Sequence, residues 1–229
     1  MMTKKSDTDA AGTDPRPPLT RDRIIAAAVA IADERGLGAV TMRAVASRLG
    51  VEAMSLYNHV ANKDDLLGGM SEAAVEQFDL PREVGDWREA MRRRAVSAHE
   101  VFGRHPWAPL LLDSRDSIGP AGLRYFDWVL GTLTEAGFEM EDAARAFSLM
   151  DSYIYGFGAQ QINMSAADDL TQEERAEVLL SYIPPEQYPY VHRMATYTME
   201  AGYDAETDFD FGLGIILDGL ERMLGTARP

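Results

Sequence analysis

Residues 41–60, with the sequence TMRAVASRLGVEAMSLYNHV, constrain the fold more than any other part of the chain. Thr41 can cap a short helix, and Gly50 can end it, because glycine tolerates the left-handed backbone that a helix stop favours. Val51 and Leu56 are spaced to pack a second short helix against the first. The narrow apolar face that would receive them is formed by Val45, Ala46 and Leu49. The pattern predicts two helices that cross at a tight turn.

The side chains left on the outer side of the second helix are small, polar or aromatic. They are Ala53, Met54, Ser55, Tyr57, Asn58 and His59. A short helix that presents such residues beyond a tight turn is typical of the helix-turn-helix, whose second helix enters the major groove of DNA. These twenty residues alone are also compatible with an ordinary helical hairpin in an all-helical protein.

Charge is distributed very unevenly along the chain. Acidic and basic side chains balance within residues 1–19 and again within residues 20–70, so the whole net charge of −15 belongs to residues 71–229. A neutral segment can bind DNA through a few well-placed cations even when it is attached to an acidic body.

The composition indicates an intracellular globular protein. There is no cysteine, which excludes disulfides and thiolate metal sites. No apolar run is long enough to cross a membrane, and the N-terminus lacks the layout of a signal peptide. We therefore expect a cytoplasmic protein with no membrane partner.

Three segments can be separated by composition. Residues 1–19 are rich in Thr, Asp, Ala, Gly and Pro and are expected to form a disordered arm. Residues 20–79 comprise a helix capped by Thr20, the helix-turn-helix, and a connecting helix that is capped by Asn62 and runs toward Phe78. Residues 80–229 begin at the proline-containing joint at 80–86 and form a second domain.

The second domain has helical periodicity throughout, and no convincing strand pattern occurs in it. Its helices are predicted at about 87–103, 107–113, 120–136, 141–164, 172–182, 187–201 and 208–225. The fold class is therefore all-α. The helices near 143–162 and 208–225 are apolar on more than one face, which predicts a homodimer that packs two helices from each subunit together. Burial within one subunit is the alternative explanation for each helix.

With these segments placed, residues 19–70 closely resemble the DNA-binding domain of TetR (tetracycline-repressor) family transcription regulators. The matching run is LTRDRIIAAAVAIADERGLGAVTMRAVASRLGVEAMSLYNHVANKDDLL. The rest of the chain is similar to the family's C-terminal domain, notably at Trp87, 135–138 and 209–221. The resemblance implies a homodimeric, all-helical repressor in which a helical domain binds a small effector and moves the connecting helix.

The family's DNA contacts can be transferred position by position. Arg43 matches an arginine that reaches a guanine edge or a phosphate, and Tyr57, His59 and Lys63 match residues that hold the DNA backbone. The other residues expected at double-stranded operator DNA are Thr41, Ala53, Met54, Ser55 and Asn58. Ala53-Met54-Ser55 replaces the Gln-Pro-Thr of the tetracycline repressors, so the operator sequence should differ from theirs.

The effector is expected to differ as well. Residues 110–115 match a stretch where the tetracycline repressors carry a histidine that holds a magnesium–drug complex, and this chain has none there. Asp113 is a weak substitute as a cation ligand, and His99, His105 and His192 lack metal-ligand spacing, so no metal or other cofactor is predicted. The predicted effector-binding residues are Trp107, Asp113, Trp128, Tyr153, Tyr155, Phe157 and Gln160.

These side chains would suit a flat, mostly apolar aromatic effector. The favoured function is therefore a ligand-responsive transcriptional regulator that acts as a repressor. Two alternatives remain at this stage. An enzyme could use the helical cavity, although the sequence offers no nucleophile–base pairing or phosphate loop. A helical interaction protein that does not bind DNA would explain the acidity and Ala53.

Overall fold

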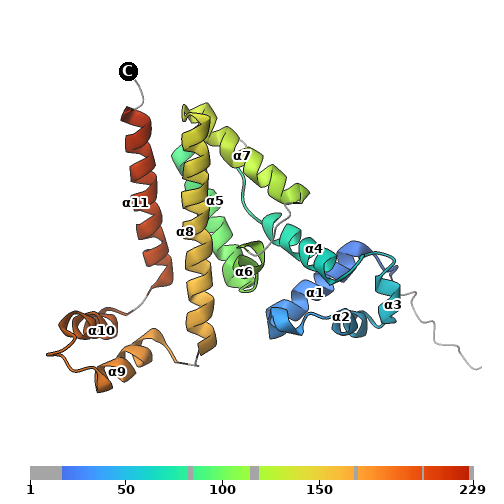
Figure 1. Ribbon diagram of the computed structural model, residues 1–229, viewed down its shortest axis with the longest axis horizontal. Coiled ribbons are helices and arrows are strands. Elements are labelled where there is room, and N and C mark those ends of the chain that lie inside the picture. The colour runs from blue at the N-terminus through green and yellow to red at the C-terminus, as the bar shows by residue number, and fades with distance from the viewer. Residues whose placement is uncertain (1–16, 82–84, 114–118, 168–169, 203, 227–229) are drawn as a thin grey trace, which may run out of the picture.

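The computed structural model describes residues 17–81, 85–113, 119–167, 170–202 and 204–226. Within them the regular structure is helical, as the sequence predicts, and Figure 1 shows a head of four helices beside a larger helical body. The head contains α1 (Arg21–Arg35), the 3₁₀ turn η1 (Leu37–Ala39), α2 (Met42–Leu49), α3 (Ala53–Leu56) and α4 (Lys63–Val75). The body contains α5 (Trp87–Arg104), α6 (Ala108–Asp113), α7 (Pro120–Ala136), α8 (Met140–Ala167), α9 (Gln172–Tyr182), α10 (Pro189–Ala201) and α11 (Ala205–Thr226).

The start and stop signals of the head helices act as the sequence predicts. Thr20, Thr41 and Asn62 cap α1, α2 and α4, and each side-chain oxygen accepts a hydrogen bond from the backbone N–H three residues ahead. Gly50 ends α2 in the left-handed conformation, with φ of 68°. Leu56 of α3 is fully buried against the core of the head. The helix-turn-helix thus rests on local signals that the chain carries in its sequence.

Two helices are shorter than the sequence suggests. Helix α3 is a single turn of four residues, and residues 57–59 continue it as a turn. Helix α4 ends at Val75, before the predicted end near Phe78, because the backbone tightens there into bonds between residues three apart. Pro81 follows soon after and disfavours a helical conformation in the residue before it. Phe78 is still buried, so the turn belongs to the core.

Helix α4 belongs to the packing of both head and body. It packs against α1 in the head and against α6 and α7 in the body. Within the head, Arg21 of α1 forms an ion pair of 2.6 Å with Asp65 of α4, and the Asp65 carboxylate also accepts the backbone N–H of Ala61 at 2.7 Å. Any displacement of α4 relative to the body must therefore carry the head with it.

The body is organised around α8, the longest helix. Helices α5, α6, α7 and α11 all pack against it, and α11 runs alongside it in Figure 1. Helices α9 and α10 pack on one another at one end of the body. None of the described helices is long and apolar enough to cross a membrane. The domain division at residue 80 stays a prediction, and the predicted arm at residues 1–19 lies mostly outside the described residues.

A buried polar cluster joins three body helices. The guanidinium of Arg94 (α5) is fully buried and donates to the Asp151 carboxylate (α8) at 2.8 Å and to the Tyr125 hydroxyl (α7) at 2.5 Å. Tyr125 in turn donates to Asp151 at 2.6 Å. Burial, partly offset by the charge of Arg94, raises the pKa of the Asp151 carboxyl. The three side chains fix how α5, α7 and α8 meet.

Replacing Arg94 with leucine should lower the free energy of unfolding by about 3 kcal/mol, because it leaves the Asp151 carboxylate buried without a cation. The loss of unfolding free energy should be larger near about pH 8 than near about pH 5, because protonation of Asp151 at the lower pH removes its uncompensated charge. Urea denaturation at constant protein concentration measures both.

Arg92→Leu is the matched control, because Arg92 lies on the same helix but pairs with Asp210 in a half-exposed ion pair of 2.8 Å. It should cost less than about 1 kcal/mol. Equal losses in the two variants would show that burial of the Arg94 cluster contributes nothing special to stability.

Candidate nucleic-acid interface and ligand cavity

The residues predicted to contact DNA lie in three neighbouring segments of the head: the start of α2, the turn of α3 with residues 57–59, and the first residue of α4. Most of them are exposed, including Met54 at 75% and Tyr57 at 45%. Ala53 and Ser55 are half-buried, since one side of the α3 turn must cover the core. We call this set the DNA face: Thr41, Arg43, Ala53, Met54, Ser55, Tyr57, Asn58, His59 and Lys63. Its contact with DNA stays a prediction.

Ion pairing decides which cations of the head are available to a phosphate. Arg48 is held by Glu34 at 2.7 Å, and Arg21 by Asp65. Arg43 and Lys63 form no ion pair with any of the described residues and are both exposed. The two cations that the family resemblance assigns to DNA are therefore free of ion pairs with the described residues, unlike Arg21 and Arg48.

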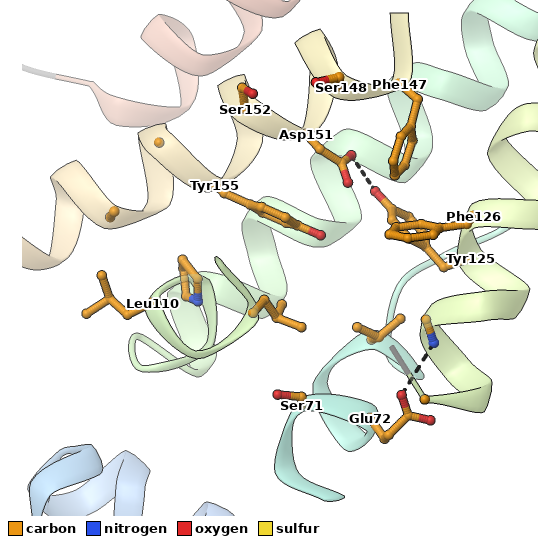
Figure 2. A pocket seen from close by; sticks show the side chains of 17 residues that line it. Ser71, Glu72, Leu110, Tyr125, Phe126, Phe147, Ser148, Asp151, Ser152 and Tyr155 are labelled. Atoms are coloured by element: carbon orange, nitrogen blue, oxygen red, sulfur yellow. Dashed lines mark hydrogen bonds between the residues drawn. The ribbon is translucent and has the colours of Figure 1, made fainter. Parts of the chain in front are cut away.

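A cavity of about 540 Å³ lies between α4, α6, α7 and α8. Figure 2 shows Ser71 and Glu72 of α4 on one side and Asp151 and Tyr155 of α8 across from them. Its aromatic wall is formed by Tyr125, Phe126, Phe147 and Tyr155. Its other polar side chains are Ser148 and Ser152. This size and mixture of aromatic and polar groups suit a small organic ligand.

The aromatic wall is held by its own ring contacts and by the buried cluster behind it. Phe126 and Phe147 meet edge to face with ring centroids 4.7 Å apart. Tyr125 contacts Phe147 and donates its hydroxyl to Asp151, as the dashed line in Figure 2 marks. Burial also raises the pKa of the Tyr155 hydroxyl, which keeps it neutral. The wall is therefore a fixed surface of neutral rings.

Among the predicted effector-binding residues whose side chains are described, Tyr155 alone lines this cavity. Trp128 lies on another side of α7 and donates to the Pro81 carbonyl at 3.2 Å, while Gln160 is exposed on α8. Tyr153 and Phe157 pack with their rings against Phe209 of α11. The side chain of Asp113 lies outside the described residues.

Trp107 has a different position from the one we expected. It is buried at the junction of head and body, where its indole N–H donates to Asp33 of α1 at 2.7 Å. His105 contacts the same carboxylate at 2.8 Å. Both side chains therefore fasten α1 to the segment between α5 and α6, and neither lines the cavity.

The polar residues that line the cavity, above all Ser71, Glu72 and Asp151, were not predicted from the sequence. Asp151 offered a signal, because it is an acid in the middle of the apolar helix α8. Ser71 and Glu72 offered none, since a Ser-Glu pair on an amphipathic helix is usually a solvated face. Within the described residues, no three histidine, aspartate or glutamate side chains gather closely enough to hold a metal ion.

Comparison with known proteins matches both halves of the chain to family models. Residues 24–70 match the model for bacterial regulatory proteins of the tetR family, and residues 80–224 match the tetracyclin repressor-like C-terminal domain.

Individual relatives agree. The chain is 32% identical over 223 residues to the HTH-type transcriptional repressor DrrR1 of Streptomyces coeruleorubidus, spanning 93% of this chain and 82% of that one. It is 29% identical to the class C tetracycline repressor protein of Escherichia coli over 90% of this chain and 92% of that one. The crystal structure of ActR from Streptomyces coelicolor in complex with actinorhodin matches with a TM-score of 0.76 and 27% identity, covering 91% of this chain and all of that one.

The helix-turn-helix of the head and the all-helical body agree with these matches, which extend over nearly the whole chain. The chain therefore belongs to the tetR family of bacterial regulatory proteins.

Proposed function

We propose that this chain is a ligand-responsive transcriptional repressor that binds a palindromic operator as a homodimer and is released by a small aromatic molecule. One observation carries the proposal: helix α4 begins at the DNA face with Lys63 and lines the cavity with Ser71, Glu72 and Val75. A ligand in the cavity thus touches the helix that supports the DNA face. The proposal places the protein with the DNA in the cytoplasm.

The names of the relatives support a regulator over an enzyme. DrrR1 is named a transcriptional repressor, and the crystal structures of ActR include complexes with actinorhodin and (S)-DNPA. The aromatic walls of the cavity, Phe126 and Phe147 in particular, suit a ligand with flat rings. The proposed effector is accordingly aromatic.

The surface of α11 supports the homodimer. Residues four or eight apart along this helix form an exposed stripe of Phe211, Ile215 and Met223, with Phe211 at 70% and Ile215 at 57% exposure. The opposite stripe, which includes Phe209 and Leu213, is buried against the body. Helix α8 beside it exposes Leu149. A second apolar stripe on a helix that is already packed indicates a partner, and we propose that this partner is the second subunit.

Replacing Tyr57 and Lys63 together with alanine should abolish specific binding to the DNA upstream of the protein's own gene, because both lose contacts to the phosphate backbone. Electrophoretic mobility shift and footprinting measure the effect. Arg48→Ala is the control: this exposed arginine of the same motif is already paired with Glu34, so its loss should change operator affinity only slightly. If the double variant still protects the same DNA, the proposed DNA face is wrong.

Replacing Phe211 and Ile215 with aspartate should yield monomers, because four carboxylates would be buried in the proposed dimer interface. Light scattering after size-exclusion chromatography gives the mass. Leu123→Asp on α7 also adds a charge at an apolar position 58% exposed and should leave the dimer intact. A dimer that survives the α11 substitutions would place the interface elsewhere.

A further inference from the structure

Glu72 occupies a special position on α4, at the boundary between two hollows of the molecule. It lines the cavity of about 540 Å³. It also lines a hollow of about 570 Å³ between α1 and α4, as Trp107 does. Its carboxylate accepts the backbone N–H of Ala121 at 2.6 Å and that of Gly122 at 3.4 Å, and Figure 2 marks the second of these bonds. The side chain thus joins α4 to the first turn of α7.

This contact is favourable for two physical reasons. The first N–H groups of a helix have no partner within the helix, and the helix dipole favours negative charge at that end. Helix α7 is itself anchored in the body, with Val129 and Leu133 fully buried. A second tie between the same helices, Glu76 to Arg124 at 3.1 Å, is exposed on both sides and contributes little. Glu72 is therefore the main polar link between α4 and α7.

The polar side chains of the cavity are mostly hydrogen-bond acceptors or neutral hydroxyls. Asp151 is neutralised by Arg94, whereas Glu72 has no cationic partner among the described residues. The described lining contains no lysine, arginine or histidine. Beside Glu72, Ser71 is only 7% exposed, and its buried hydroxyl has no hydrogen-bond partner in the described part of the chain. A ligand that brings donor groups would satisfy both residues, and an anionic ligand would meet an uncompensated carboxylate.

We propose that Glu72 is the residue through which the effector acts: the effector carries an ammonium or hydroxyl group that binds the Glu72 carboxylate and draws it away from the amides of α7. Helix α4 then loses its main polar link to α7 and can shift relative to that helix. This inference rests on the proposed function, since it assumes that the cavity binds the effector. It adds the chemistry of the effector and the residue that transmits its binding.

The effector chemistry can be tested with three fluorescent probes that share one ring system: anthracene carrying an aminomethyl, a hydroxymethyl or a carboxylate group on its central ring. The full-length protein should bind the ammonium probe at least about tenfold more tightly than the carboxylate, the factor expected for one charge-assisted hydrogen bond. Glu72→Gln should remove this preference. Glu76→Gln, four residues further along the chain and outside the cavity, should keep it.

The outcomes separate the two proposals. Equal binding of all three probes, or tighter binding of the carboxylate, would overturn the inference and leave the cavity as a ligand site. If no probe binds, the aromatic-ligand cavity fails and the inference fails with it. A preference that persists in Glu72→Gln would assign recognition of the cation to another residue.

The link to α7 can be broken without removing the charge. A Cβ atom added at Gly119 would lie 2.4 Å from the Glu72 carboxylate oxygen, and what must move is the end of a flexible side chain. Gly119→Ser introduces this Cβ while supplying a residue that caps α7 well. Its backbone φ of −87° is ordinary for serine, so no strain follows. Gly131→Ala on the same helix is the control, because nothing lies within 4 Å of the new Cβ.

Operator affinity, measured by fluorescence anisotropy with and without the ammonium probe, reports on the link. Gly119→Ser should bind the operator about tenfold more weakly than the wild type without probe, since a freed α4 no longer holds the head in one arrangement. The ammonium probe should weaken operator binding by Gly119→Ser much less than it weakens operator binding by the wild type. A Gly119→Ser variant with wild-type affinity and wild-type response to the probe would overturn the role of Glu72, whereas failure of the wild type itself to bind would overturn the proposed function.

Discussion

The packing of α4 against two parts of the molecule is the constraint on which the rest of the structure depends. At its N-terminal end Asp65 fastens it to α1, and near its C-terminal end Glu72 fastens it to α7. Because both ties are made by one rigid helix, the head cannot adopt a new position while both remain. The sites proposed for DNA and for a ligand thus share one element, helix α4.

The cavity owes its shape to the buried cluster of Arg94, Tyr125 and Asp151. These three side chains come from α5, α7 and α8, and their hydrogen bonds are 2.5–2.8 Å long and buried. Such a network fixes the separation of the helices more narrowly than apolar contacts alone, because hydrogen bonds depend strongly on distance and direction. The aromatic wall is therefore formed before any ligand arrives.

The sequence predicted the helices well because their signals are local. Gly50 and the capping side chains of Thr41 and Asn62 act within four residues of themselves. The cavity was predicted poorly because it is made by residues far apart in the chain. Trp107 has the character of a ligand-binding ring in the sequence, but in the fold it is buried and donates to Asp33. Glu72 has the character of a solvated residue, but in the fold it accepts a hydrogen bond from the first turn of α7. Periodicity tells which face of a helix is buried but not what it is buried against.

The ion pairs of the head also affect how the protein would respond to its surroundings. With Arg21 and Arg48 committed to carboxylates, Arg43 and Lys63 are the cations of the proposed DNA face that would displace ions from DNA on each subunit. Four such cations in a dimer correspond to a slope of roughly −4 in the logarithm of affinity against the logarithm of salt concentration, shallow compared with regulators that contact many phosphates. Doubling the salt concentration would then weaken operator binding by a little more than about tenfold, against about a thousandfold for a regulator with a slope of roughly −10. Salt would therefore act on operator occupancy together with the ligand, but less steeply than in a regulator with many phosphate contacts.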